Sequence, residues 1–285
     1  MRQYIDLHTH STASDGSLAP AELVRQAAKE GITILALTDH DSTDGLAEAE
    51  AEAGRLGIEF VRGCELSSQT PYGHADFLGL WLPGETVEFE AKLAWMREAR
   101  ARRNEVMLEK LDQLGLTLGF DPASFPNLKS LGRPQIAVQM VRQGYVKNPQ
   151  EAFNRYLGRG RPAYAPKESP SPEEAVKMLH EAGAVTVFAH PMLLAAPPDW
   201  LEDLIKSLIP HGLDALEAYH SEHSNASVRR VLDLADKYGL LLSGGSDFHG
   251  APKPSISIGR GKGGFRVPEY ILDGLRARRL EKQGS

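Results

Sequence analysis

The fold is decided by the run Thr33-Ile34-Leu35-Ala36-Leu37-Thr38-Asp39-His40-Asp41, in which apolar residues lead directly into three titratable ones. This pattern predicts a short buried strand whose carboxyl end carries polar side chains. The stretch Pro20–Gly31 precedes it and predicts a helix, with proline in the first turn and glycine as its stop. A helix feeding a short apolar strand is typical of an α/β protein with a largely parallel sheet.

Six further segments have the same short apolar character. They are Tyr4–Leu7, Glu59–Val61, Ala75–Leu80, Ala184–Ala189, Leu213–Ala218 and Leu240–Ser243. Residues 85–164 interrupt this alternation of helices and short strands, because they show helical periodicity and no convincing strand. We therefore predict one α/β domain, formed by residues 1–84 and 165–285, with a small helical insertion at 85–164 that caps the site.

Composition narrows the class of protein. A net charge of −6 argues against a broad basic surface for long duplex nucleic acid, although bound cations would reverse the field locally for a small anion. A single cysteine, Cys64, excludes an internal disulfide and suits a reducing cytosol. The chain leads straight into its first strand and has no run of about 18 apolar residues. We expect a cytoplasmic protein with no signal peptide, no membrane span and no obligate protein partner.

Residues that can bind metal ions recur where predicted strands end. His8 and His10 close the first strand, two residues apart and therefore on one face. Asp247 and His249 repeat this spacing after the last strand. The other candidates are Asp15, His40, Glu65, His74 and His190. Each could singly be a capping or turn residue, but α/β sites assemble at the carboxyl ends of parallel strands, so together they predict a metal centre.

The third and fourth strands are expected to bring Glu65 and His74 together. Glu65 is expected to end its strand, and a hairpin through Pro71-Tyr72-Gly73 would place His74 at the start of the next one. Imidazole and carboxylate without thiolate fit Mn²⁺ best here, with Zn²⁺ or Fe²⁺ as alternatives. Nine candidates are too many for one tetrahedral ion, so we expect two or three divalent cations. Such clusters suit in-line hydrolysis of phosphoesters.

Other residues are candidates for holding a substrate. Arginine guanidinium groups match phosphate oxygens bidentately, and Arg133, Arg159 and Arg161 lie between glycines and prolines in or near the insertion. A solvated basic loop is the alternative for each of them. His220 and His223 follow another predicted strand and are candidates to line the pocket.

The ordered series of these motifs resembles the PHP (polymerase and histidinol phosphatase) family. The resemblance implies a distorted, TIM-like βα barrel of seven strands, and it implies three groups of ligands. The first ion would take His8, His10, Glu65 and Asp247. The second would take Glu65 as a bridge, His74 and His190. The third would take Asp15, His40 and His249.

Within that family, the insertion and the run Leu37–Gly45 resemble the branch that acts on nucleotides. Its members include 3′,5′-nucleoside bisphosphate phosphatases, AMP phosphatases and enzymes that trim 5′ nucleotides from short RNA. In that branch an arginine of a Gly-Arg-Pro motif helps to hold phosphate, which implies this role for Arg133. The chain departs from the motif at Gln135, where close relatives are expected to have histidine.

We therefore expect a phosphatase acting on a nucleotide such as AMP or a 3′,5′-nucleoside bisphosphate. A metal-bound hydroxide would attack phosphorus in line, Arg133 would orient the phosphate, and Asp39 would orient a ligand imidazole. A 5′→3′ exonuclease on short single-stranded RNA and a histidinol-phosphate phosphatase are alternative hypotheses. A barrel whose metals only stabilise it or bind a partner is the alternative that is not an enzyme.

Overall fold

The structure, a computed structural model, describes residues 4–84, 87–119, 131–261 and 266–283. Residues 85–86 and 120–130 of the predicted insertion therefore lie outside the described residues. The chain forms two compact units. We call residues 1–90 and 170–285 the barrel unit, and residues 91–169 the helical unit.

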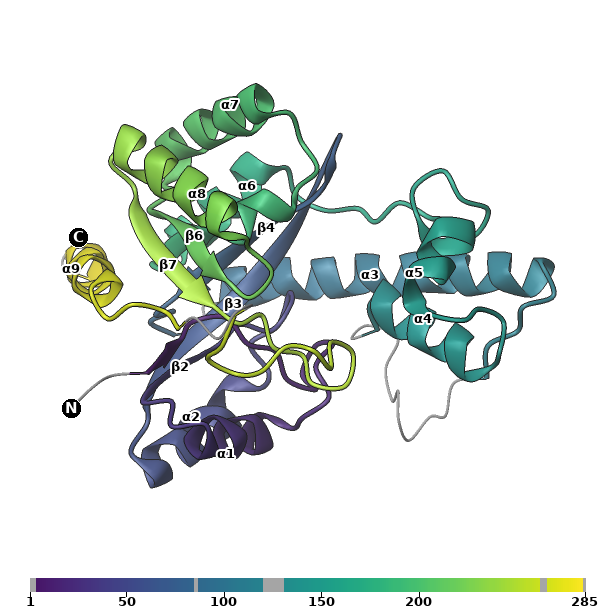
Figure 1. Cartoon of the computed structure of the whole chain (residues 1–285), viewed down its shortest axis with the longest axis horizontal. Helices are drawn as coiled ribbons and strands as arrows, with labels where there is room; N and C mark the ends of the chain where they lie inside the picture. The colour runs from purple at the N-terminus through teal and green to yellow at the C-terminus, as the bar shows by residue number, and fades with distance from the viewer. Residues whose placement is uncertain (1–3, 85–86, 120–130, 262–265, 284–285) are drawn as a thin grey trace. The chain divides into compact units, whose positions relative to one another are not determined.

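Seven strands form one sheet in chain order (Figure 1). They are β1 (Ile5–Asp6), β2 (Ile34–Leu37), β3 (Glu59–Thr70), β4 (Gly73–Leu80), β5 (Val185–Phe188), β6 (Ala215–His220) and β7 (Leu241–Gly245). Pairing is parallel from β1 to β3 and from β5 to β7, whereas β4 runs antiparallel to both of its neighbours. The Leu7 amide donates to the Gly244 carbonyl at 3.2 Å, which nearly closes the sheet into a barrel. The predicted seven-stranded α/β barrel is confirmed.

Strand β2 shows why the sequence was informative. Ile34 and Ala36 belong to the apolar cluster that the strands share, and Leu35 and Leu37 pack on the other face. That second face is covered by α1 (Pro20–Lys29) and α2 (Leu46–Leu56). A strand buried on both faces must be apolar along its whole length, so it is visible as a continuous run.

Further helices surround the sheet in the barrel unit (Figure 1). They are α6 (Pro172–Glu181), η2 (Pro191–Leu193), α7 (Pro198–Leu208), η3 (Ile209–His211), α8 (Asn225–Tyr238) and α9 (Ile271–Gln283). Helix α6 begins with a capping box, in which Glu174 accepts from the Ser171 amide at 2.7 Å and Ser171 Oγ accepts from the Glu174 amide at 3.2 Å. Buried Asp214 anchors α9 by accepting from Arg278 at 2.5 Å and pairing with Lys282 at 2.7 Å.

The helical unit has a core of its own. Its elements are most of α3 (Val87–Gln113), then α4 (Arg133–Arg142), α5 (Pro149–Ala152) and the π-helix η1 (Phe153–Leu157). Met107 and Leu111 of α3 pack with Ile136 and Met140 of α4 and with Leu157. The described residues of this unit contain no strand.

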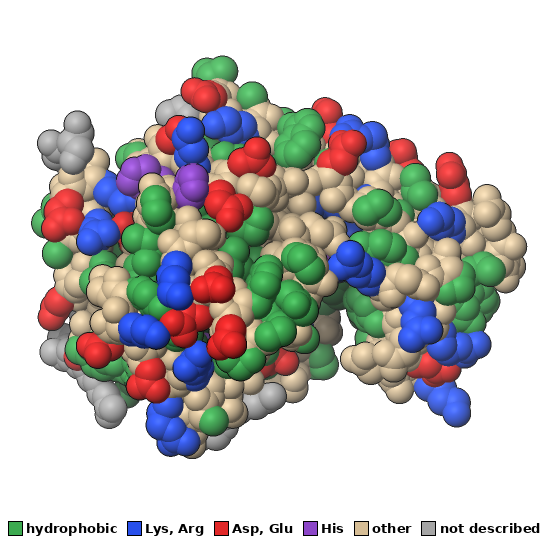
Figure 2. Space-filling view, turned by 90° about the horizontal axis from the view of Figure 1, so that it is seen from above, with side chains coloured by type: hydrophobic (Ala, Val, Ile, Leu, Met, Phe, Trp, Pro, Cys, Tyr) green, Lys and Arg blue, Asp and Glu red, His purple; other side chains and the backbone are tan. Residues whose placement is uncertain are grey.

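On the face drawn in Figure 2, basic and acidic side chains are interspersed rather than separated. This face therefore offers no broad field of one sign. Among the described helices, none combines the length and the apolar character that a bilayer crossing requires.

Candidate metal centre

The candidate ligands meet at the carboxyl ends of the parallel strands. His8 and His10 follow β1, His40 follows β2, and His190 follows β5. The remaining strand-end candidates, Asp247 and His249, follow β7, and the Asp247 amide donates to the His8 carbonyl at 2.8 Å. Parallel strands present their carboxyl ends on one side of a barrel, which explains how segments distant in sequence supply one site.

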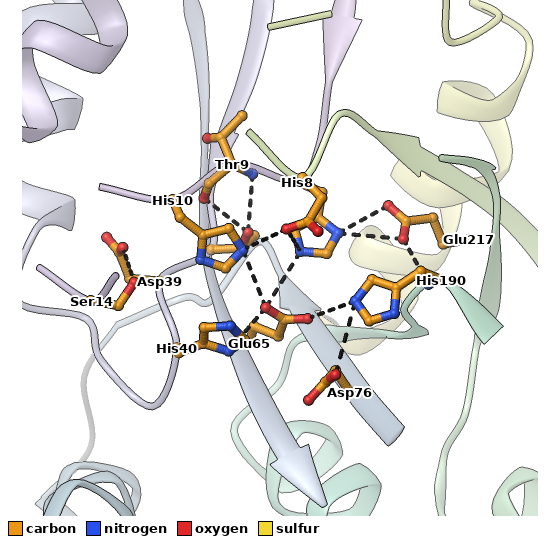
Figure 3. Close-up of polar contacts among 12 residues, drawn as sticks. His8, Thr9, His10, Ser14, Asp39, His40, Glu65, Asp76, His190 and Glu217 are labelled. Carbon is orange, nitrogen blue, oxygen red and sulfur yellow. Dashed lines mark hydrogen bonds and ion pairs between the residues drawn. The ribbon is translucent and has the colours of Figure 1, made fainter. Parts of the chain in front are cut away.

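Glu65 of β3 lies at the centre of this cluster (Figure 3). Its Oε2 atom is 3.4 Å from His8 Nε2, 3.2 Å from His10 Nε2 and 3.1 Å from His40 Nδ1. Its Oε1 atom is 3.3 Å from His190 Nε2. The two oxygens therefore face different imidazoles, so Glu65 could contribute one oxygen to each of two groups of ligands.

Three overlapping groups have one ligand atom per residue within 4.8 Å of one another. They are His8-His10-Glu65, His10-Asp15-His40-His249 and Glu65-Asp76-His190. Asp247 adjoins the first group, because its Oδ1 lies 3.2 Å from His10 Nε2 and 3.4 Å from His8 Nε2. In the second group, Asp15 Oδ1 lies 3.1 Å from His249 Nε2.

The expected proximity of Glu65 and His74 is wrong. Strand β3 does not end at Glu65 but continues to Thr70, so Glu65 pairs with Leu78 and His74 pairs with Gln69. Four residues of strand separate the two by roughly 13 Å along β3. The group that contains Glu65 and His190 has Asp76 as its third member, in place of the expected His74. Asp76 Oδ2 lies 4.0 Å from His190 Nε2.

Within the described part of the chain, several buried polar atoms at the centre of the cluster lack a hydrogen-bond partner, and this bears on whether metal ions fit the site. Among the described residues, His8 Nε2, both ring nitrogens of His10 and both oxygens of Glu65 have no hydrogen-bond partner. Buried polar atoms rarely lack a hydrogen-bond partner, because each unsatisfied group costs about 1–3 kcal/mol. Imidazole nitrogens and carboxylate oxygens aimed at common points satisfy one another through divalent cations. The residues present therefore fit a cluster of such ions.

The charges of the cluster agree with this. Burial would raise the pKa of Glu65, but the imidazoles of His40 and His8 outweigh it and hold that pKa well below its usual range. Burial would lower the pKa of His10, yet the carboxylates of Asp247 and Glu65 raise it to about 10. Metal ions would therefore displace protons from these imidazoles, which makes metal binding weaken as the pH falls.

The backbone at the cluster is strained. Asp41, His190 and Asp247 have positive φ angles of 53°, 30° and 56°. Non-glycine residues pay about 1–3 kcal/mol for such conformations, which are found at functional sites when the surroundings enforce them. Here the strained residues include two candidate ligands and the neighbour of a third, His40.

Glu217 is a further site residue that sequence reasoning missed. It is fully buried in β6, its Oε1 lies 3.1 Å from His8 Nδ1, and its Oε2 accepts from the His190 amide at 2.8 Å (Figure 3). A carboxylate at Nδ1 fixes the ring and leaves Nε2 directed at the cluster. A charged residue inside an apolar strand was the available signal, since a buried charge requires a partner. The same signal was present at Asp76 within β4.

Asp39 does not have the role that the sequence suggested. Its carboxylate accepts from the Ser11 amide at 2.8 Å, from Ser11 Oγ at 2.6 Å and from Ser14 Oγ at 2.5 Å. It therefore braces the turn that carries Asp15 rather than orienting an imidazole. The prediction failed because it relied on adjacency to His40 in sequence, whereas the partners come from the segment after β1.

His220 and His223 are both buried near the cluster. His220 Nδ1 accepts from the Glu222 amide at 3.1 Å, and its Nε2 lies 3.5 Å from Asp247 Oδ2. His223 stands behind it, with ring centroids 5.2 Å apart, and its Nδ1 lies 2.9 Å from the Ala218 carbonyl oxygen. Burial lowers the pKa of His223 to about 4, with a smaller electrostatic contribution from the neighbouring His220. The structure thus brings His220 beside a candidate ligand.

The three candidate arginines all lie in the helical unit. Arg133 opens α4, with its guanidinium carbon 6.0 Å from the centre of the Phe153 ring. Gln135, the departure from the family motif, accepts from the Gly132 amide at 3.0 Å and so caps α4. Arg159 and Arg161 are exposed in the segment that follows η1.

Replacing Glu217 with glutamine should weaken metal binding about 10- to 100-fold, because the supporting charge at His8 Nδ1 is lost. Calorimetric titration with Mn²⁺ measures this, and activity should recover at high Mn²⁺ concentration if the role is positioning. Glu181→Gln, at an exposed position on α6, is the matched control. Equal Mn²⁺ affinity in both variants would contradict this role for Glu217.

Comparisons with known proteins agree with the geometry. A family model described as PHP domain matches residues 6–157. A 3′,5′-nucleoside bisphosphate phosphatase of Chromobacterium violaceum is 35% identical over 257 residues, covering 90% of each chain. A 5′–3′ exoribonuclease of Haemophilus influenzae is 33% identical and covers 87% of this chain and 91% of its own.

Two solved structures are also similar. An amidohydrolase from Chromobacterium violaceum with bound sulfate has a TM-score of 0.87 at 35% identity, with 96% of each chain covered. A protein from Bifidobacterium adolescentis described as a metal-dependent phosphoesterase has a TM-score of 0.84 at 28% identity, with 98% of this chain and 97% of the other covered.

Proposed function

The chain belongs to the PHP domain family, and we propose that it hydrolyses phosphate monoesters of nucleotides, with AMP or a 3′,5′-nucleoside bisphosphate as substrate. Action on phosphoric ester bonds follows from the family and its relatives. The observation that carries the proposal is the gathering of four imidazoles around both oxygens of buried Glu65.

We propose that the site holds two or three divalent cations, Mn²⁺ or else Zn²⁺ or Fe²⁺. Such cations supply an activated water near neutral pH and neutralise charge that develops on phosphoryl oxygens. The proposed ligands are His8, His10, Asp15, His40, Glu65, Asp76, His190, Asp247 and His249. Glu217 holds the His8 ring, and Glu65 joins the first group of ligands to the third. The chain thus fixes the ligand positions before substrate arrives, which lowers the cost of reaching the transition state.

His220 and His223 are proposed to line the substrate site. The Nδ1 atom of His220 accepts a backbone hydrogen bond, so the proton of the neutral ring is on Nε2, toward Asp247. An N–H in that position can donate to a phosphoryl oxygen. His223 supports the His220 ring through its own backbone contact.

Arg133 is proposed to bind the substrate phosphate, with Arg159 and Arg161 as further candidates. Arg133→Gln should raise KM for the nucleotide about 10- to 100-fold with little change in kcat, because the lost contact binds substrate and transition state alike. Steady-state kinetics measures both constants. Arg155→Gln, which removes an exposed arginine of the same unit, should leave KM unchanged. An unchanged KM in Arg133→Gln would remove Arg133 from the proposal.

A 5′→3′ exonuclease acting on short RNA is a second candidate, favoured by the Haemophilus relative and its long alignment. With Mn²⁺ present, phosphate release should be measured on AMP, 3′,5′-bisphosphoadenosine and histidinol phosphate, and release of 5′-mononucleotides should be measured on a 5′-phosphorylated oligoribonucleotide. The proposed function expects the highest kcat/KM on one of the first two. Preference for the oligonucleotide would establish the second candidate, and no turnover on any of the four would refute both.

A further inference from the structure

Lys253 lies in the loop after β7, and its ammonium contacts the cluster. Its Nζ atom is 2.5 Å from Asp247 Oδ2. Lys253 is the only lysine or arginine among the described residues in contact with Asp247. The other side-chain contacts are His8, His10, His220 and His249. Asp247 therefore faces the imidazoles of His8, His10 and His249 through Oδ1, and it faces His220 and the Lys253 ammonium through Oδ2.

The loop holds Lys253 at the edge of the cluster. The Lys253 amide donates to the Gly250 carbonyl at 3.0 Å, and the Ile256 amide donates to the Lys253 carbonyl at 3.0 Å. These bonds form consecutive turns, so the backbone of Lys253 is fixed relative to His249. One third of the side chain, 33%, is exposed. Burial would lower the pKa of Lys253, but the Asp247 carboxylate outweighs it and raises the pKa above its usual value.

An ammonium and a divalent cation compete for the same carboxylate. An ion bound among His8 and His10 would take Asp247 Oδ1, whereas Lys253 holds Oδ2, so the two cations would share one carboxylate and repel each other across a few ångströms. The four-carbon stem of lysine is flexible, so the ammonium can turn away while the backbone stays in place. One third of the Lys253 side chain is exposed, so an anion that arrives from solvent can reach the ammonium.

We propose that Lys253 is an anion-binding residue of the barrel unit that pairs with the phosphoryl group held at the metal cluster. Its contact with Asp247 is then the resting position of the ammonium in the absence of cations. The inference rests on the proposed function. It adds a contact to the phosphoryl group from the barrel unit, whereas the three candidate arginines belong to the helical unit. Because Lys253 and the cluster belong to one unit, this contact is independent of where the helical unit lies.

Inorganic phosphate is the probe, because it carries the same tetrahedral dianionic group. The full chain is loaded with Mn²⁺, its metal content is measured, and phosphate binding is titrated by calorimetry. Lys253→Met keeps the length of the side chain and removes its charge, so the Kd for phosphate should rise about tenfold or more. Lys253→Arg should stay within about threefold of the native chain. Lys177→Met, at an exposed lysine of α6, is the matched control and should leave the Kd unchanged.

Two results would overturn the inference. One is an unchanged phosphate Kd in Lys253→Met at equal Mn²⁺ content. The other is a weaker Kd that disappears once the variant is brought to full Mn²⁺ content, since the lysine would then act on metal retention alone. Lys253→Gln serves as a second neutral variant if Lys253→Met folds poorly. If the native chain hydrolyses no phosphoester but binds phosphate through Lys253, the proposed function fails and the inference stands.

Discussion

Replacing Glu65 with glutamine is expected to lower phosphoesterase turnover more than about 10³-fold. Glu65 directs Oε1 at His190 and Oε2 at His8, His10 and His40, so both oxygens are needed where the ligand groups meet. An amide offers one oxygen, and its NH₂ group would point hydrogen atoms at positions that cations require. Glu65→Gln should therefore weaken metal binding at both of the ligand groups that share Glu65, and not at one ion alone.

Turnover and bound metal should be measured on the same preparations of Glu65→Gln. Metal content is expected to fall together with activity, and far-ultraviolet circular dichroism should show that the helices and strands remain. Glu181→Gln makes the same chemical change at an exposed site and should keep native activity and metal content. Native turnover in Glu65→Gln would contradict a bridging role and with it the proposed arrangement of the site.

The strands were predictable where both of their faces are buried. The run at residues 33–37 corresponds to β2, because every side chain of that strand contacts apolar neighbours. The length of β3 was not predictable in this way. Its last third, Ser67–Thr70, is polar and is held in the sheet by pairing with β4. Backbone pairing leaves no apolar run in the sequence, so the hairpin was predicted to be shorter than it is.

The same physical distinction separates the site residues. His8, His10 and Asp247 could be brought together from sequence, because the carboxyl ends of parallel strands meet whatever the details of register. Glu217 contacts His8, which lies far from it in sequence. Lys253 contacts Asp247 from an irregular loop. The hydrophobic periodicity of the sequence does not predict such contacts. What the sequence did contain was a carboxylate inside each of two apolar strands, β4 and β6.

Register decides between Asp76 and His74, and this gives a sharp prediction. Asp76 pairs with Ser67, which is on the same face of β3 as Glu65, whereas His74 pairs with Gln69 farther along the strand. Asp76→Ala should therefore lower turnover about 10²-fold or more, because it removes a carboxylate from the group with Glu65 and His190. His74→Ala should change turnover less than about threefold, since surface changes away from a site cost little.

The two alanine variants control for each other, because both positions belong to β4 and project from the same face of the hairpin. Turnover at saturating Mn²⁺ and Mn²⁺ affinity should be compared, with Asp76→His as a rescue. An imidazole at position 76 offers a ligand atom of another kind, so it should restore part of the Mn²⁺ affinity that alanine loses. If His74→Ala were the inactive variant instead, the register of β3 and β4 would have to shift. Such a shift would carry Glu65 away from His190, so the outcome tests the bridge as well as the ligand.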